Sequence, residues 1–341
     1  MTTTHMRQEI NEIPEAIARL LDISGPAIEQ AGAALRKADP AFVATIARGS
    51  SDHASLFLKY AIELVSGRAV ASLGPSLASI YGTKLSLKGS AVFAVSQSGR
   101  SPDIVAMLNA ATAAGALTLT LTNAAGSPLW DAADLKLDIA AGPEIAVAAT
   151  KSYVSSAVAG LAVLAAWSGD TALQDAVKAL PSHLAKALEL DWSAMLPVIS
   201  KTESLYVLGR GPSLAIASEA ALKFKETSDI HAEAYSSAEV MHGPVALVGR
   251  DFPVLVLAAR DAAETSVVEA AEALAAKGSS VFVTSDLARK ATRLPFTATG
   301  HPLTDALALI VPFYGFTEAL SRLRGFNPDQ PVALKKVTET Q

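Results

Sequence analysis

The sequence predicts an α/β fold in which two doubly wound parallel sheets follow one another along the chain. Apolar runs of strand length alternate with Ala-rich helical stretches over most of the 341 residues. This alternation is typical of parallel sheets with helices on both faces. Arg48 and Arg210, each followed by glycine, come directly after the first strand-like run of their halves. Ser96 and Ala258, at the ends of the next runs, are separated by the same number of residues as this arginine pair. The equal spacing indicates a duplicated α/β unit.

Six runs rich in Val, Leu, Ile, Phe and Thr are the predicted strands. They are FVATIA (42–47), AVFAV (91–95), ALTLTLT (116–122), SLYVLG (204–209), PVLVLAA (253–259) and SVFVTS (280–285). The expected divisions of the chain are an N-terminal helical segment (1–34), a first domain (35–168), a charged, proline-containing connector (169–195), a second domain (196–328) and a C-terminal tail (329–341).

The composition favours a soluble, globular protein. Half of the residues are hydrophobic, 18% are charged and the net charge is −5, so no nucleic-acid or membrane-surface partner is indicated. The absence of cysteine excludes disulfides and a cysteine nucleophile within these residues. The first residues lack the apolar core of a signal peptide, and the apolar run Ala157–Trp167 is too short to span a bilayer. We therefore expect a buried helix at that run and a cytoplasmic protein.

The strand at 91–95 ends in SQSGRSPD, a turn with several hydroxyls and little side-chain bulk. Ser101 and Pro102 are expected at the N-cap and first position of a helix, whose positive end suits a phosphate. Gly99 allows the backbone to approach a ligand closely. A capped turn without a ligand would use the same residue types. The phosphate site is favoured because the loop after the first strand adds more hydroxyls; the candidate side chains are Ser50, Ser51, Ser96, Ser98 and Ser101.

Other ligand motifs are not indicated. The GxxxxGK[ST] pattern is absent, and GRGPSL (209–214) has leucine in place of the third glycine of a dinucleotide fingerprint. The six histidines are scattered and form no HxxxH pattern, so no metal or other cofactor is predicted.

A second candidate site follows GRGPS. Glu219, Lys223 and Glu226 are spaced i, i+4 and i+7, so they share one face of a helix. Most such triplets are solvated stripes, but the flanking Ala and Leu residues favour a buried carboxylate that transfers protons. His242, in the tight MHGP loop, titrates near neutrality and is a candidate acid or base. His231 is expected to be structural.

These residues resemble a known family. SQSGRSPD, ALKFKETSDIHAEAYSSAEVMHGPVAL and NPDQPVALKKVTET look like the sugar isomerase (SIS) domain pair, and the resemblance extends from about residue 35 to the end. The nearest groups are the isomerase half of glucosamine-6-phosphate synthase and stand-alone amino-sugar-phosphate deaminases. The resemblance implies two tandem flavodoxin-like domains, a homodimer, and fructose 6-phosphate or glucosamine 6-phosphate as ligand.

The resemblance also implies roles for single residues. Glu226 matches the glutamate that shuttles a proton between C1 and C2, and Lys223 matches the lysine of the same helix. His242 matches a ring-opening histidine that the neighbouring subunit donates. Lys336, with Lys335 as a rival, matches a tail lysine able to form an imine; contact with a phosphate or carboxylate is an alternative role for this lysine. The ligand-contacting set adds Gln97 and Val147 to the serines named above.

Two departures favour a deaminase. The synthase carries a glutaminase domain with a cysteine nucleophile, which is not found in these 341 residues, and Arg100-Ser101-Pro102 replaces the synthase's Glu-Thr-Ala. We therefore predict conversion of glucosamine 6-phosphate to fructose 6-phosphate and ammonia. Alternatives are amination of fructose 6-phosphate by free or partner-supplied ammonia, another phosphosugar isomerase, a galactosamine-6-phosphate deaminase or a deglycase. A sugar-phosphate sensor is disfavoured, because no basic DNA-binding segment is recognised.

Overall fold

The computed structural model describes residues 3–331, 334 and 336. These residues divide into two compact units, each built on one sheet. We call them the β1–β5 unit (Glu15–Glu144, Lys151–Lys178 and Lys336) and the β6–β10 unit (residues 3–14, Ile145–Thr150, and 179–334 as far as they are described). Lys335, the predicted rival of Lys336, lies outside the described residues.

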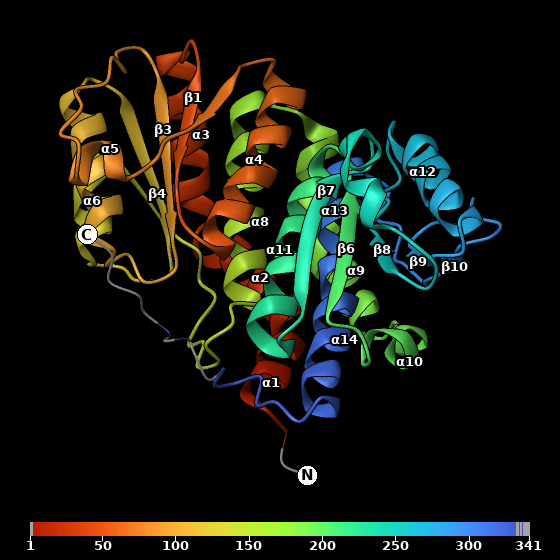
Figure 1. The fold of residues 1–341 in the computed structure, drawn as a ribbon. Coiled ribbons are helices and arrows are strands. Elements are labelled where there is room, and N and C mark those ends of the chain that lie inside the picture. Colours follow the sequence, from red (N-terminus) through yellow and green to blue (C-terminus); the bar gives the residue numbers. More distant parts are fainter. Residues whose placement is uncertain (1–2, 332–333, 335, 337–341) are drawn as a thin grey trace. The chain divides into compact units, whose positions relative to one another are not determined.

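The sheet of the β1–β5 unit is parallel throughout, with strand order β2-β1-β3-β4-β5 (Figure 1). Its strands are β1 (Val43–Ile46), β2 (Val70–Ser72), β3 (Ala91–Ser96), β4 (Leu117–Thr122) and β5 (Leu135–Asp138). The predicted runs at 42–47, 91–95 and 116–122 are confirmed as β1, β3 and β4. From β1 the chain first adds β2 on one side and then returns to add β3, β4 and β5 on the other. The point between β1 and β3 is therefore a topological switch point, where doubly wound sheets bind ligands.

Helices cover both faces of this sheet. The helices α3 (Gly25–Ala38), α4 (Ser50–Ser66) and α8 (Lys151–Ser168) form one layer, and α5 (Ser76–Ser79) and α6 (Pro102–Ala113) lie on the opposite face (Figure 1). The short α7 (Pro128–Ala132) packs beside α6. All but the last residue of α8 are buried, as expected for a helix that is apolar on every side. The buried helix predicted at Ala157–Trp167 is therefore confirmed.

The sheet of the β6–β10 unit repeats the same parallel order, here β7-β6-β8-β9-β10. Its strands are β6 (Ser204–Gly209), β7 (His231–Ser236), β8 (Pro253–Val256), β9 (Ser280–Val283) and β10 (Thr292–Arg293). The turns after β1 and β6 share one conformation, because Gly49 (φ 57°, ψ −134°) and Gly211 (φ 59°, ψ −136°) are nearly identical. These positive φ angles favour glycine. The α/β fold class with two tandem parallel sheets, predicted from the sequence, is confirmed.

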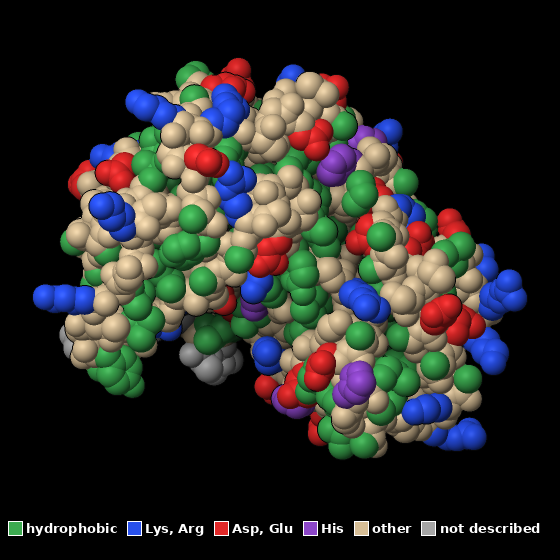
Figure 2. Space-filling view, turned by 90° about the horizontal axis from the view of Figure 1, so that it is seen from above, with side chains coloured by type: hydrophobic (Ala, Val, Ile, Leu, Met, Phe, Trp, Pro, Cys, Tyr) green, Lys and Arg blue, Asp and Glu red, His purple; other side chains and the backbone are tan. Residues whose placement is uncertain are grey.

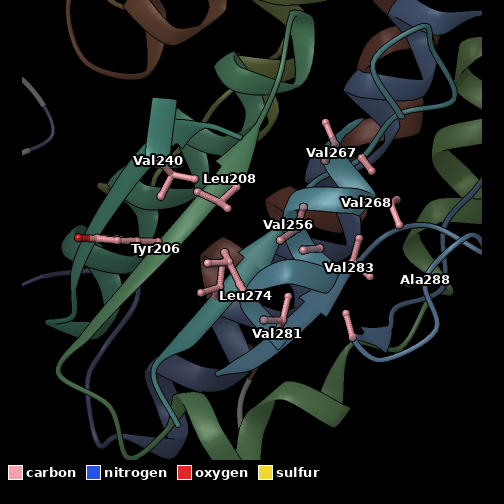
Figure 3. Close-up of a cluster of buried hydrophobic side chains, with 14 of the residues drawn as sticks. Tyr206, Leu208, Val240, Val256, Val267, Val268, Leu274, Val281, Val283 and Ala288 are labelled. Carbon is pink, nitrogen blue, oxygen red and sulfur yellow. The ribbon is translucent and has the colours of Figure 1, made fainter. Parts of the chain in front are cut away.

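The helices of the second unit also form two layers. The helices α11 (Pro212–Ser228), α13 (Pro302–Ala308) and α14 (Ile310–Leu323) lie on one face of the sheet, and α12 (Glu264–Ala276) covers the other (Figure 1). Figure 3 shows the core under α12, where Val256, Val281 and Val283 of the strands meet Val267 and Leu274 of the helix. Burial of these branched side chains stabilises the sheet by the hydrophobic effect.

The remaining elements flank the two sheets. They are α1 (His5–Asn11), α2 (Ile13–Ile23), α9 (Thr171–Leu188), α10 (Leu196–Ile199) and the 3-10 turns Ser193–Met195, η2 (Glu239–His242) and η3 (Pro244–Leu247). The segment predicted as a connector thus contains one long helix with Pro181 in its interior.

Within the described part of the chain, one helical stretch, Pro302–Leu323, is long and apolar enough to cross a bilayer, but 89% of it is buried in the protein. Core helices have the same composition, so this stretch is weak evidence for a membrane span. On the face shown in Figure 2, acidic and basic side chains are interspersed and no broad basic patch is visible.

Candidate active site

The hydroxyl turn lies at the carboxyl end of β3. Ser101 is the N-cap residue and Pro102 the first residue of α6, as predicted, but the Ser101 hydroxyl makes no capping hydrogen bond. The Ser96 hydroxyl accepts a hydrogen bond from the Gly99 N–H at 3.2 Å, and the Ser98 hydroxyl accepts one from the Arg100 N–H at 3.4 Å. Arg100 itself is exposed. The turn therefore presents side-chain oxygens beside the positive end of a twelve-residue helix.

Gly99 is required by the packing of this turn. Its φ is +61°, and a Cβ there would lie 2.8 Å from the Ser127 Cβ and 3.0 Å from the Thr122 Oγ1. Ser127 cannot move aside without cost, because its hydroxyl caps α7 by accepting the Trp130 N–H. Glycine is thus needed for close packing against the neighbouring β4–α7 turn as well as for the turn's backbone conformation.

The loop after β1 brings a second helix terminus to the same edge. Ser50 and Ser51 are the first two residues of α4, and β1 pairs directly with β3. Gln97 extends the β3 turn, and its carbonyl accepts the Asn123 N–H at 3.2 Å. The predicted ligand-contacting residues Ser50, Ser51, Ser96, Gln97, Ser98 and Ser101 therefore come from adjoining strand ends at the switch point of one sheet.

An ion pair that the sequence analysis missed joins these two loops. The Arg48 Nε donates to the Asp103 Oδ2 at 2.6 Å, and the Asp103 side chain is fully buried. Asp103 is the last residue of SQSGRSPD, and no partner for it was predicted. The repeated arginine after the first strand of each half was the available signal.

The predicted carboxylate–lysine triplet lies on α11 and is buried, so the alternative of a solvated stripe is wrong. Lys223 contacts both carboxylates: its Nζ lies 3.3 Å from the Glu219 Oε1 and also bonds the Glu226 Oε2. The side chains of Glu219 and Lys223 are completely buried, whereas 20% of the Glu226 side chain is exposed. Of these three residues, Glu226 is therefore the one with side-chain surface that a ligand could reach.

Tyr314 of α14 completes this buried network and was not predicted. Its hydroxyl donates to the Glu219 Oε1 at 3.1 Å. Burial, the largest single influence, lowers the pKa of Lys223, but the charges and hydrogen bonds of Glu219 and Glu226 outweigh it and raise the pKa above its ordinary value. Lys223 is accordingly held as a cation beside Glu226.

Glu226 lines a cavity of about 810 Å³ in the β6–β10 unit. The walls come from the end of α11 and from the chain after α14, and the lining includes Leu222, Lys225, Thr227, Phe326, Asn327 and Gln330. Cavities of several hundred Å³ with a few polar groups are typical of small-molecule sites. Glu226 thus lines a space large enough for a sugar.

Val147 lies in a segment that the N-terminal helix and the tail hold together. Its N–H donates to the Asp329 carbonyl at 3.1 Å. The Asp329 carboxylate accepts the first amides of α1, from His5 at 2.9 Å and Met6 at 2.8 Å. Glu9 of α1 accepts the Ala146 N–H at 3.3 Å. The helix α1 therefore fixes both Val147 and the chain that leads into the tail.

The remaining candidates differ in exposure. His242 ends η2 and is exposed. His231 lies at the start of β7 with a side chain 66% exposed, its Nδ1 3.3 Å from the Ser204 hydroxyl. The Lys336 Nζ lies 3.2 Å from the Glu144 Oε2, so this lysine contacts a carboxylate, one of the two roles that the sequence left open. In the described residues, no cluster of three or more His, Asp or Glu side chains is arranged to hold a metal ion.

Known proteins with the same fold and sequence pattern were identified by comparison. The family model described as the SIS domain matches this chain twice, at residues 35–166 and 198–309. Glutamine–fructose-6-phosphate aminotransferase (isomerizing) of Symbiobacterium thermophilum is 34% identical over 323 residues, which are 89% of this chain and 51% of that protein. The chain spans about half the length of that relative.

Two crystal structures agree with these matches. One, of a candidate phosphosugar isomerase from Silicibacter pomeroyi DSS-3, has 54% sequence identity and a TM-score of 0.93 over 96% of this chain and 100% of that chain. The other, the C-terminal domain of glucosamine-fructose-6-phosphate aminotransferase from Francisella tularensis, has 25% identity and a TM-score of 0.86 over 97% of this chain and 99% of that chain. The chain belongs to the SIS domain family. Within it, the chain is related to the isomerizing aminotransferases, and the resemblance stated from the sequence is confirmed.

Proposed function

We propose that this protein is an amino-sugar-phosphate isomerase that converts glucosamine 6-phosphate to fructose 6-phosphate and ammonia. The observation that carries the proposal is the partly exposed Glu226 side chain, which lines a large cavity and whose carboxylate pairs with a buried lysine. Isomerisation between an aldose and a ketose needs one base that removes a proton from one carbon and returns it to the next. Glu226 is suited to this work.

The phosphate would bind at the edge of the first sheet. Serine hydroxyls from the loops after β1 and β3 and the N-termini of α4 and α6 supply uncharged donors and partial positive charge. The Arg48–Asp103 ion pair ties the two loops together, so the donors are held in place before the ligand arrives. Ser50, Ser51, Ser96, Gln97, Ser98 and Ser101 are the proposed ligand contacts, and Val147 would contact the sugar.

The proposed chemistry distributes three further roles. His242 would open the pyranose ring as an acid or base, and its exposed position in η2 is compatible with donation to the site of a second copy in a homodimer. Lys223 would stabilise negative charge that develops on the sugar oxygen while Glu226 moves the proton. Lys336 would form an imine with the open-chain sugar. No cofactor takes part in this scheme, and a cytoplasmic location remains a prediction.

The opposite direction is the second candidate. The curated relative described above is named as a glutamine–fructose-6-phosphate aminotransferase. Amination would use ammonia that is free or supplied by a partner. We place deamination first because Arg100-Ser101-Pro102 stands in the β3–α6 turn where the resembled synthase has Glu-Thr-Ala.

One assay separates these candidates. Purified protein is incubated with glucosamine 6-phosphate, and both ammonia and fructose 6-phosphate are measured; the reverse reaction uses fructose 6-phosphate with ammonium. Equal release of the two products supports deamination. Glucosamine 6-phosphate formed only in the reverse reaction supports the aminotransferase, and turnover of neither amino sugar nor ketose would refute the proposal. Galactosamine 6-phosphate in parallel tests the choice of epimer.

A further inference from the structure

Glu144 is a buried carboxylate that the proposed chemistry has not used. It lies between β5 and α8 with its side chain fully buried. Its Oε1 accepts the Ser152 N–H at 3.0 Å, and its Oε2 accepts the Ser152 hydroxyl at 2.5 Å. The Lys336 Nζ donates to the same Oε2 at 3.2 Å. Three donors thus converge on one carboxylate.

The start of α8 supplies hydrogen-bond donors to this carboxylate. Ser152 is the second residue of an eighteen-residue helix, so its N–H is one of the amides without a partner inside the helix. A carboxylate at this position gains from the positive end of the helix dipole and from charge-assisted hydrogen bonds. Glu144 is therefore a fixed negative charge, whose position is set by the helix and not by the tail.

Lys336 depends on Glu144 for its position. One quarter of the lysine side chain is exposed, and its charged end reaches the buried carboxylate across 192 residues of sequence. A lysine side chain loses up to about 2 kcal/mol of rotamer freedom when it is held in one place. A buried counter-charge is the kind of partner that offsets this cost, because its interaction with the ammonium is poorly screened by solvent.

We propose that Glu144 is the positioning residue of the tail lysine and the group that exchanges its proton. This inference rests on the proposed function. Lys336 is held as an ammonium by Glu144 until an open-chain sugar phosphate is bound. The carboxylate therefore determines both where the amine is and when it becomes a nucleophile.

The proton balance follows from the contact. The Lys336 ammonium gives one proton to the Glu144 Oε2, and the neutral amine adds its electron pair to the sugar carbonyl carbon, forming a carbinolamine. Glu144 returns the proton to the carbinolamine hydroxyl, the C–O bond breaks, and water leaves as the protonated imine forms. No proton or electron is gained or lost overall, and Glu144 ends as the anion it was at the start.

The test combines trapping with a double-mutant cycle. The full-length protein, Glu144→Gln, Lys336→Met and the double variant are incubated with fructose 6-phosphate and sodium cyanoborohydride, which reduces an imine to a stable amine. Peptide mass spectrometry measures the adduct on Lys336, and kcat and KM are measured with glucosamine 6-phosphate. Asp134→Asn is the matched control, because it changes a carboxylate of the same unit that bonds Thr118. Glu144→Asp tests whether a shorter carboxylate restores function.

We expect Glu144→Gln to lower kcat and the adduct yield by about tenfold or more, with a smaller change in KM and partial recovery in Glu144→Asp. We also expect that Glu144→Gln causes no further loss of kcat when it is combined with Lys336→Met. A Glu144→Gln adduct yield within twofold of the wild-type value would overturn the inference, as would an equal kcat loss in both backgrounds. If Glu144→Gln does not fold, Glu144→Asp takes its place in the cycle with the same criteria. Absence of turnover in the wild-type protein would instead refute the proposed function.

Discussion

Glu226 differs from the two residues beside it because part of its side chain is exposed. Glu219 and Lys223 are fully buried, and the Tyr314 hydroxyl donates to the same Glu219 oxygen that Lys223 contacts. The buried pair acts as a support that orients Glu226 and surrounds it with fixed charge, while Glu226 itself lines the cavity. The difference in burial favours Glu226 among the three for the proposed proton-transfer role.

Replacement of Glu226 by glutamine should remove the base and keep its size. We expect kcat for glucosamine 6-phosphate to fall about 10²–10⁴-fold, the range typical of one general acid–base group. KM should change little, because the proposed phosphate contacts are other residues. Steady-state kinetics and binding of the sugar phosphate by calorimetry measure the two effects. Near-normal turnover would show that another residue is the base.

Lys223→Met should destabilise the fold as well as the reaction. It leaves the Glu219 carboxylate buried without its cation, a change that costs about 3–5 kcal/mol in comparable pairs. Because the pKa of Lys223 is raised in the folded protein, the ion pair contributes its full stabilisation of the fold at pH values below the pKa of lysine in the unfolded chain, about 10.4. This stabilisation is lost as the pH rises through the higher folded pKa.

Denaturant unfolding from pH 7 to 11 tests both statements. The free-energy difference between wild-type and Lys223→Met should be constant near neutrality and shrink in strongly alkaline buffer. Lys178→Met is the control, because Lys178 and Asp175 form an exposed pair 4.0 Å apart and such pairs contribute little. An equal loss of stability in both variants would contradict the buried-pair interpretation.

At the scale of elements, the sequence located the central strands and missed the edge strands. The six predicted runs became β1, β3, β4, β6, β8 and β9, which are the inner strands of the two sheets, whereas β2, β5, β7 and β10 are at the edges. Inner strands of a parallel sheet are buried on both faces and therefore read as continuous apolar runs. Edge strands such as HAEAYS (β7) are partly exposed and carry polar residues, so pattern alone does not reveal them.

The β3–α6 turn makes a prediction at this scale. Gly99→Ala should raise KM for the sugar phosphate about tenfold or more, because a Cβ there meets Ser127 and Thr122 and displaces the turn. Gly126→Ala is a matched control: its φ is also positive, +73°, but a Cβ would have no atom within 4 Å. Both changes carry the backbone cost of alanine at positive φ, about 1 kcal/mol. Thermal unfolding measures the backbone cost that both variants share, and steady-state kinetics measures the effect of the clash on KM. Equal KM values for Gly99→Ala and Gly126→Ala would contradict the proposed role of the turn.

At the scale of the whole molecule, one sheet order occurs twice but only one copy keeps the hydroxyl turn. The loop after β8 has Arg260 and Asp261 where the loop after β3 has serines. The Arg260 Nε forms an ion pair with the Glu264 Oε1 at 2.8 Å, and the Arg260 guanidinium lies over the ring of Phe296. The second copy instead supplies the Glu226 carboxylate and His242. In the proposed function, the first copy would therefore bind the phosphate and the second copy would transfer the proton.

Dimerisation yields a prediction for the whole protein. If His242 acts in the site of the partner subunit, then mixing inactive Glu226→Gln with inactive His242→Asn should restore activity, because each mixed dimer contains one site with both residues intact. Random exchange makes half of the dimers mixed, so about one quarter of wild-type activity per protomer is expected for a two-fold dimer. Size-exclusion chromatography establishes the oligomeric state first. A mixture that stays inactive after subunit exchange would show that His242 serves its own subunit or none.

The sequence by itself determined the fold class, the repeat, the inner strands and most of the residues of the proposed site, because each of these leaves a local pattern: apolar runs, repeated spacing, or a turn rich in serine and glycine. Tertiary structure decided what depends on partners far away in sequence. Examples are the Arg48–Asp103 pair between two loops, Tyr314 on Glu219, and the contact of Lys336 with Glu144. A charged residue looks the same in sequence whether it is solvated or buried, and only the folded chain shows which opposite charge it meets and how much water remains between them.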